Sequence, residues 1–279
     1  MRTKPVAAAS PASSTASIYM ALLLLIVTPG TSTADFLLFP TATYEHRANI
    51  NEAPGMSGHT GGHQDNMLDT LRPGMNLFYT RDGDRLRILA EFMLTAQEGH
   101  PERLQIGYRL RPETTIWAGQ FHNPMSYWNT QFHHGEYLTT SISHPGMDTY
   151  EHDGGALSTH LSGVLLESKH RTGNAAISIA LALGTAAWLD MDSDHILQPT
   201  NLAKPNHFGH FFASGRLTWH PDPDGPSEIG LFAGHTEIPV DHDPMLSTVK
   251  QQTSGLYGNW DNGHARILGS LYVVGNQLI

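Results

Sequence analysis

The most regular feature of the chain after Asp35 is an alternation of apolar and polar residues with a period of two. Residues 84–95, DRLRILAEFMLT, place every second residue on one apolar face: Leu86, Ile88, Ala90, Phe92 and Leu94. Residues 102–111 and 264–275 repeat the pattern. Because successive side chains of a strand point to opposite faces of a sheet, this period predicts β-strands with one apolar face.

The segment 174–189 alternates bulky apolar residues with small ones. The bulky set is Ile177, Ile179, Leu181 and Leu183, and the small set is Ala176, Ser178, Ala180 and Ala182. In a membrane barrel the bulky face contacts lipid and the small face borders the lumen or an inward loop. In a soluble barrel the bulky face turns inward, so the orientation of this segment separates the two classes.

The same alternation predicts eleven strands, at 36–48, 73–81, 84–96, 102–111, 114–123, 157–169, 174–189, 206–219, 226–238, 251–261 and 264–275. Tight turns rich in Gly, Asp, Asn or Pro are expected at 81–84, 111–114, 171–174, 222–225 and 261–263. Longer connections follow at 49–72, 97–101, 124–156, 190–205 and 239–250. Alternating short turns and long loops are typical of an outer-membrane barrel.

Aromatic residues support this interpretation, because four of them lie beside the predicted tight turns: Tyr79, Tyr108, Trp219 and Trp260. Membrane barrels collect such rings at the interface, and Trp188 is a candidate for the opposite girdle. The predicted fold is therefore an all-β, antiparallel transmembrane β-barrel with a long inward-folded loop. An odd number of strands cannot close an antiparallel barrel, so we expect the barrel to be incomplete.

The N-terminal region has the features of a secretory signal peptide. Arg2 and Lys4 precede a short apolar run at 18–27, and small residues follow before Asp35. The apolar run is too short to span a bilayer as a helix, which needs roughly 20 residues. We therefore expect a signal peptide at 1–34, a single barrel domain at 35–279, and localisation in the outer membrane of a bacterial cell.

Composition excludes several classes of function. The chain has 279 residues, a formal net charge of −10 and no cysteine. Disulfides, thiolate metal sites and a cysteine nucleophile are therefore excluded, and the acidic balance argues against nucleic acid as a partner. No cofactor is expected.

The chemically richest stretch is FHNPMSYWNTQFHHGEYLTT at 121–140. We expect its polar residues, with others of the connection 124–156, to narrow a pore: His122, Asn123, His133, His134, Glu136, His144, Glu151 and Asp153. A metal site is the second interpretation, with His122, His133 and Glu136 as its weak candidates. Adjacent histidines on an extended segment point to opposite sides, and no HExxH motif is present. No catalytic residue is identified, so the chain is not expected to be an enzyme.

Charged residues on the polar faces of the strands are expected to line the pore: Arg85, Arg87, Glu91, Arg109, Arg111, Arg216 and Arg266. Acidic residues concentrate instead in the long connections: Asp148, Glu151, Asp153, Asp190, Asp192, Asp194, Asp241 and Asp243. This distribution predicts an acidic outer mouth above a basic inner ring, and a ring of arginines favours anions.

The segment IWAGQFHNPMSYW resembles bacterial outer-membrane porins of the phosphate-selective O/P-like superfamily. In that group a strand with a G-[RQK]-F-x-x-P segment leads into a long loop that folds toward the channel. The matching residues here are Gly119, Gln120, Phe121 and Pro124. The chain has only four lysines and ends in Ile279 rather than an aromatic residue. The resemblance is therefore to a divergent, C-terminally truncated member without phosphate selectivity.

The resemblance implies a channel for passive diffusion of small polar or anionic solutes, in contact with outer-membrane lipid and often assembled as a homotrimer. The alternative from a different class is an exported, histidine-rich β-barrel protein that binds copper or zinc.

Overall fold

The computed structural model describes residues 33–45, 70–95, 99–125, 127–132, 157–190, 197–198, 210–241 and 247–279, and these are almost entirely antiparallel sheet. Consecutive strands pair along the path β1 (Thr33–Glu45), β2 (Thr70–Asp82), β3 (Leu86–Thr95), β4 (Gly99–Arg111), β5 (Thr114–His122), β6 (His160–Thr172), β7 (Ala175–Thr185), β10 (Phe212–His220), β11 (Glu228–Asp241), β12 (Thr248–Asp261) and β13 (Arg266–Leu278). The predicted all-β antiparallel fold is confirmed. Each predicted strand along this path overlaps an observed one.

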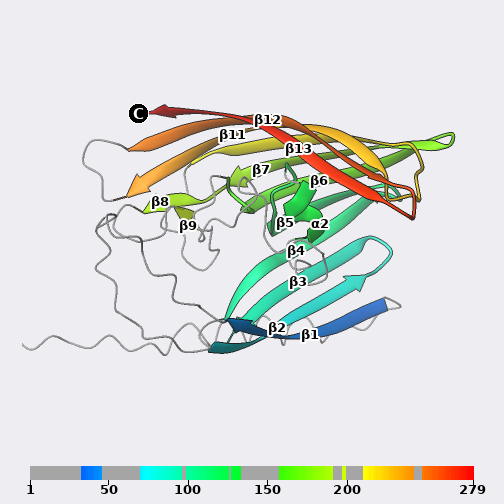
Figure 1. Ribbon diagram of the computed structural model, residues 1–279, viewed down its shortest axis with the longest axis horizontal. Coiled ribbons are helices and arrows are strands. Elements are labelled where there is room, and N and C mark those ends of the chain that lie inside the picture. Colours follow the sequence, from blue (N-terminus) through cyan, green and yellow to red (C-terminus); the bar gives the residue numbers. More distant parts are fainter. Residues whose placement is uncertain are drawn as a thin grey trace, which may run out of the picture.

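The sheet curls into an open barrel. In Figure 1 it runs from β1 and β2 at the bottom, through β5 and β6, to β12 and β13 at the top. The short helix α2 (Tyr127–Phe132) lies within the curve. Among the strand pairings of the described residues, none joins β1 to β13, so the sheet is not closed. Within the same ranges, no helix has the length and apolar character needed to cross a bilayer.

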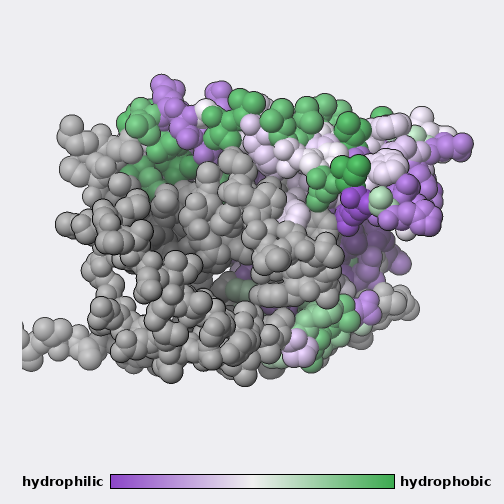
Figure 2. Space-filling view, in the orientation of Figure 1, coloured by the Kyte–Doolittle hydropathy of each residue, from purple (hydrophilic) through white to green (hydrophobic). Residues whose placement is uncertain are grey.

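The bulky face of β7 points outward. Leu181 and Leu183 are 47% and 55% exposed, whereas Ala180 and Ala182 are 5% and 1% exposed. Large apolar side chains are exposed in the same way on neighbouring strands, including Leu217, Leu231, Leu256 and Leu271. Figure 2 shows apolar side chains gathered over β11–β13 and hydrophilic ones at the turn end.

This outward surface needs an apolar solvent. Each Å² of apolar surface left in water costs about 25 cal/mol, and soluble monomers rarely expose large contiguous apolar patches. The orientation of β7 is the one expected of a membrane barrel and the opposite of a soluble one. The fold is therefore that of a transmembrane barrel, with its bulky apolar face pointing outward.

The inner face of the sheet holds the core. Side chains from β5, β6, β7, β10, β11 and β12 pack there against residues of α2 and the segment before it, and the largest are Trp117, Phe121, Met125, Tyr127, Leu161, Phe212, Phe232 and Tyr257. The aromatic girdle is partly as predicted. Tyr108, Trp219 and Trp260 are exposed on the outward face near the turns, whereas Tyr79 is half-buried.

The tight turns lie together at one end of the sheet, on the right in Figure 1. Two of them are tied to each other, because Arg171 forms an ion pair of 2.5 Å with Asp224 and Lys169 donates to the carbonyl of Pro223. The hydrogen bond from Arg171 holds the pKa of Asp224 below its usual value. The predicted alternation of turn and long loop is wrong at one place, because only residues 96–98 separate β3 from β4.

The predicted strand 174–189 is also wrong in its length. β7 ends at Thr185, and β8 (Trp188–Asp190) leaves it to pair in parallel with the end of β11, where Leu189 lies opposite Val240. β9 (Leu197–Gln198) pairs with β8. β10 begins opposite Thr236, so β11 extends beyond it, and β8 covers the edge that remains. Trp188 is half-buried there rather than part of an exposed girdle.

Three glycines lie side by side across β5, β6 and β7. Gly119 is opposite Gly163, which is opposite Gly184. A Cβ added at any of the three would lie 2.1 Å from a carbonyl oxygen of a neighbouring strand, and Gly119 has a φ of +133°. Only glycine permits this approach of the backbones. Beyond this line the alternation of exposed and buried residues stops, and residues 120–123 are all buried.

Replacing Gly163 with alanine is therefore expected to destabilise the barrel. The new Cβ collides with the carbonyl oxygen of Leu183, and such overpacking costs about 1–3 kcal/mol. Gly258→Ala is the matched control, because nothing lies within 4 Å of its added Cβ. Urea midpoints of the folded protein in detergent check this. Equal midpoints for the two variants would show that the glycine line carries no packing constraint.

Candidate functional site

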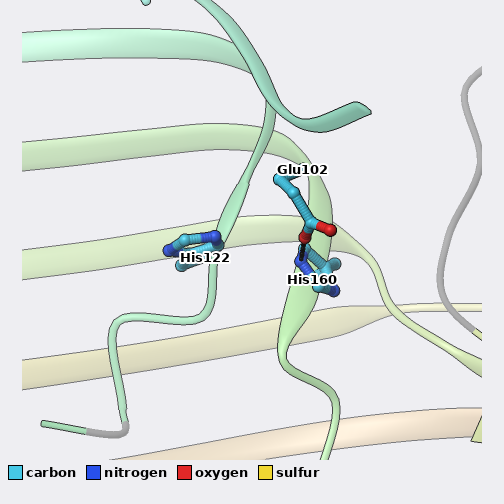
Figure 3. A group of neighbouring side chains, drawn as sticks. All are labelled: Glu102, His122 and His160. Carbon is cyan, nitrogen blue, oxygen red and sulfur yellow. Dashed lines mark hydrogen bonds and ion pairs between the residues drawn. The ribbon is translucent and has the colours of Figure 1, made fainter. Parts of the chain in front are cut away.

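A group of buried polar side chains lies where β4, β5 and β6 meet at the end opposite the tight turns (Figure 3). Glu102, His122 and His160 are 3%, 7% and 4% exposed. His122 is opposite His160 in the β5–β6 ladder. Glu102 lies at an irregularity of β4, because Glu91 pairs with Arg103 while Phe92 pairs with Pro101. Such bulges re-aim side chains and are frequent beside functional sites.

The three side chains contact one another directly. Nε2 of His160 is 2.7 Å from Oε2 of Glu102, and Nδ1 of His160 is 3.1 Å from Oγ1 of Thr159. The rings of His122 and His160 meet edge to face, with centroids 5.4 Å apart. One donor atom from each of the three residues lies within 4.8 Å of the others. Two imidazoles and a carboxylate at this separation can exchange protons or bind a cation.

An ion pair with a buried carboxylate borders this group. Glu91 is fully buried and forms a close ion pair with Arg103. Nε2 of Gln120 donates to the carbonyl oxygens of Pro101 and Glu102, at 3.1 and 3.3 Å. Gln120 therefore holds the bulge of β4 in place. Glu91, which was expected to line the pore, is instead buried beside the group of Glu102, His122 and His160.

Asn123 fastens the start of the long connection after β5. Its Nδ2 donates to the carbonyl of Ser158 at 2.8 Å, and its Oδ1 accepts the backbone N–H of Met125 at 3.1 Å. Its own backbone N–H donates to the carbonyl of Thr159. The porin-like residues Gly119, Gln120, Phe121 and Pro124 thus serve to pack and fix this corner.

Helix α2 continues from this corner onto the inner face. Tyr127 stacks on Tyr257, with centroids 4.9 Å apart, and Arg266 donates to the Tyr127 hydroxyl at 3.3 Å. Arg216 donates to Oγ1 of Thr130 at 2.9 Å. Burial raises the pKa of Tyr127, so its hydroxyl stays protonated at neutral pH. The expected inward fold of the loop is therefore confirmed for residues 124–125 and 127–132.

The remaining predicted pore-lining arginines lie near the turn end. Arg87 lies over the ring of Trp117, 5.0 Å from its centroid, and Arg109 binds Asp82 at 2.7 Å. Arg111 is exposed beside the β4–β5 turn. Arg85 departs from the expectation, because it donates to the hydroxyl of Tyr108, whose ring belongs to the outward face.

Several predicted loop residues lie outside the described residues: His133, His134, Glu136, His144, Glu151 and Asp153. Of the metal candidates His122, His133 and Glu136, only His122 is described, and its neighbours are Glu102 and His160. Sequence reasoning missed both neighbours. The turn at 111–114 predicts that β4 and β5 pair, but a regular hairpin there would place Arg103 opposite His122, and the register shift between Arg109 and Arg111 brings Glu102 there instead. The sequence carries no comparable signal for His160.

Comparisons with known proteins add little to this geometry. No family model and no curated protein matches the chain. A solved structure to which it is similar is OmpT, an outer membrane protein of Vibrio cholerae, at a TM-score of 0.35 and 8% identity over 90% of this chain and 78% of that one. At that level the likeness supports no argument about activity, and membership of the phosphate-selective superfamily is not supported.

The expectation that the chain is not an enzyme is corrected. It rested on the absence of a visible catalytic set in the sequence, and the structure brings Glu102, His122 and His160 together in a buried group. Imidazole and carboxylate groups in contact are the common means of general acid–base chemistry. The comparison with OmpT gives the exclusion no support either, so it does not stand.

The anchoring of α2 generates a test. Replacing both Arg216 and Arg266 with methionine removes the hydrogen bonds to Thr130 and Tyr127. Hydrogen bonds from a charged donor contribute about 1.5–3 kcal/mol each. Losing one should therefore increase the fraction of molecules in which α2 has left the inner face at least about tenfold. Chymotrypsin cleavage within 127–132 should accelerate accordingly.

Arg171→Met serves as the control for this test, because its ion pair with Asp224 lies on the turns. Cleavage rates in detergent, followed by mass spectrometry of the fragments, check the expectation. Unchanged cleavage in the double variant would show that neither arginine holds the helix.

Proposed function

We propose that the chain forms a porin-like channel of the bacterial outer membrane, through which small polar or anionic solutes diffuse passively. The observation that carries this proposal is the orientation of the two faces of the sheet. Bulky apolar side chains point outward, as Leu181 and Leu183 do, while the inner face carries arginines and other polar residues beside its packed aromatic core. In lipid only helices and barrels satisfy every backbone polar group, and a barrel leaves an interior that can hold water.

The charge of the inner face supports a preference for anions. Arg87, Arg109, Arg216 and Arg266 alternate with outward-facing residues on β3, β4, β10 and β13. The acidic residues of the same region are Glu167 and Glu228, which bind Trp117 and His220, and Asp82, which pairs with Arg87 and Arg109. Arginines outnumber these carboxylates, and a positive lining attracts anions and repels cations. Phosphate selectivity is not part of the proposal, because the chain has only four lysines.

Helix α2 supports the channel as its narrowing element. It lies on the inner face, held by Tyr257, Arg216 and Arg266 on three different strands. A segment fixed across the inside of a barrel reduces the cross-section available to solutes. The proposed pore therefore passes between α2 and the part of the wall that it does not contact.

Contact with lipid predicts that an arginine on the outward face lowers the folding stability by an amount that depends on its depth in the bilayer. Leu181→Arg near the middle of β7 should impair folding by about 2–4 kcal/mol, whereas Ile267→Arg near a turn should cost about 0–1 kcal/mol. Both residues are exposed on the outward face. On a soluble protein both changes would stay within about 0.5 kcal/mol. Folding titrations in lipid vesicles measure the difference, and equal values would contradict the assignment of the lipid face.

Selectivity tests the channel itself. The natural protein in a planar bilayer with a KCl gradient should show a reversal potential on the anion side. Arg87→Gln combined with Arg266→Gln removes two charges of the inner face and should move the reversal potential toward that of an unselective pore. Arg171→Gln is the control, since its ion pair with Asp224 lies on the turns. A cation-selective wild type, or the absence of any conductance, would overturn the proposal.

A further inference from the structure

We propose that Glu102, His122 and His160 bind a divalent transition-metal ion of the zinc class, in the wall of the barrel. The site differs from the histidine-rich loop that the sequence suggested, because two of its three ligands come from β4 and β6 (Figure 3). It does not depend on whether the barrel conducts solutes.

The geometry needs only small adjustments to hold an ion. Zinc bonds to imidazole nitrogen or carboxylate oxygen are about 2.0–2.2 Å long, which places the ligand atoms of a tetrahedral site roughly 3.3 Å apart. The contact of 2.7 Å between His160 and Glu102 must open slightly, and the widest separation in the group is below 4.8 Å. Side-chain rotations suffice for both changes, because the three backbones are already fixed in neighbouring strands.

The chemistry of the ligands selects the class of ion. Two imidazoles and one carboxylate suit zinc, copper, nickel or iron, whereas calcium and magnesium require oxygen ligands. Three protein ligands also leave a fourth position open, as in catalytic rather than structural zinc sites. The sequence contains no cysteine, so a thiolate site is excluded throughout the chain.

Charge and burial favour a cation at this place. Arg103 forms an ion pair with Glu91, whereas the carboxylate of Glu102 is buried beside two imidazole rings. Burying net charge is costly unless it is compensated. A divalent ion between Glu102 and the two rings supplies that compensation.

The surroundings orient the ligands in the way that metal sites require. When Nε2 of His160 binds the ion, Nδ1 carries the proton and donates it to Oγ1 of Thr159, which is 3.1 Å away. Hydrogen bonds of this kind fix the ring and its tautomer in metal sites. Gln120 holds the carbonyl of Glu102 and thereby the bulge that directs this carboxylate toward the rings.

The proposal is tested by measuring the zinc affinity of the purified natural protein in detergent, by competition with a chromophoric chelator. Glu102→Gln and His160→Gln should each lower the zinc affinity of the proposed site by more than about 100-fold. Loss of a residue that only hydrogen-bonds to a ligand already lowers metal affinity by about 10–100-fold. Thr159→Val should fall within that smaller range. Glu102→Gln keeps an oxygen that accepts the N–H of His160, so it separates loss of a ligand from loss of structure.

Two controls make the result specific. His220→Gln alters a buried histidine outside the group, whose ring contacts Ser178 and Glu228 at 2.8 and 3.3 Å, and should leave the affinity unchanged. His133→Ala combined with His134→Ala should also leave it unchanged. If zinc affinity survives Glu102→Gln and His160→Gln, or is lost only in the His133/His134 double variant, the proposed site is wrong. Cobalt(II) bound to the site should show visible d–d absorption that disappears in Glu102→Gln, and its persistence would equally overturn the proposal.

Discussion

The pairing of every strand with its chain neighbour is the constraint on which the rest of the structure depends. Each strand between β1 and β13 pairs its backbone N–H and C=O groups with the strands on both sides, without help from water. Only then can side chains such as Leu181 and Leu231 face outward over the full length of the sheet. The same ladder fixes the alternation of faces, because a shift of one residue would turn every apolar side chain inward.

The departures from regular pairing are concentrated at one corner and create the buried site. The glycine line across β5–β7 lets the backbones come close, and the bulge in β4 turns Glu102 toward the histidines. Ion pairs and amide hydrogen bonds then offset the cost of burying polar groups at this corner, which a regular alternation of faces would have left exposed. A local relaxation of sheet geometry is thus the physical origin of the chemistry that the barrel wall can carry.

Period-two patterning was enough to predict the strands, because burial on one face is a property of each strand by itself. It failed at 186–189, where Leu189 packs on Val240 of a distant strand. The alternation continues there, but it does not indicate a continuation of β7. It failed also at Glu102, because the irregularity of β4 opposite Glu91 and Phe92 interrupts the alternation there. His160 was beyond reach, since its partner strand is set by pairing across the whole connection after His122.

The docking of α2 has a consequence for the order in which the molecule assembles. Thr130 is joined to a residue 86 positions later in the chain, and Tyr127 to one 139 positions later. A hairpin can form as soon as its two strands exist. A contact between residues so far apart in the chain is opposed by the entropy of closing the long loop between them, until the intervening strands are ordered. During biogenesis the helix α2 therefore has no surface to dock on until β10, β12 and β13 have joined the sheet. The interior stays unobstructed until these strands are in place.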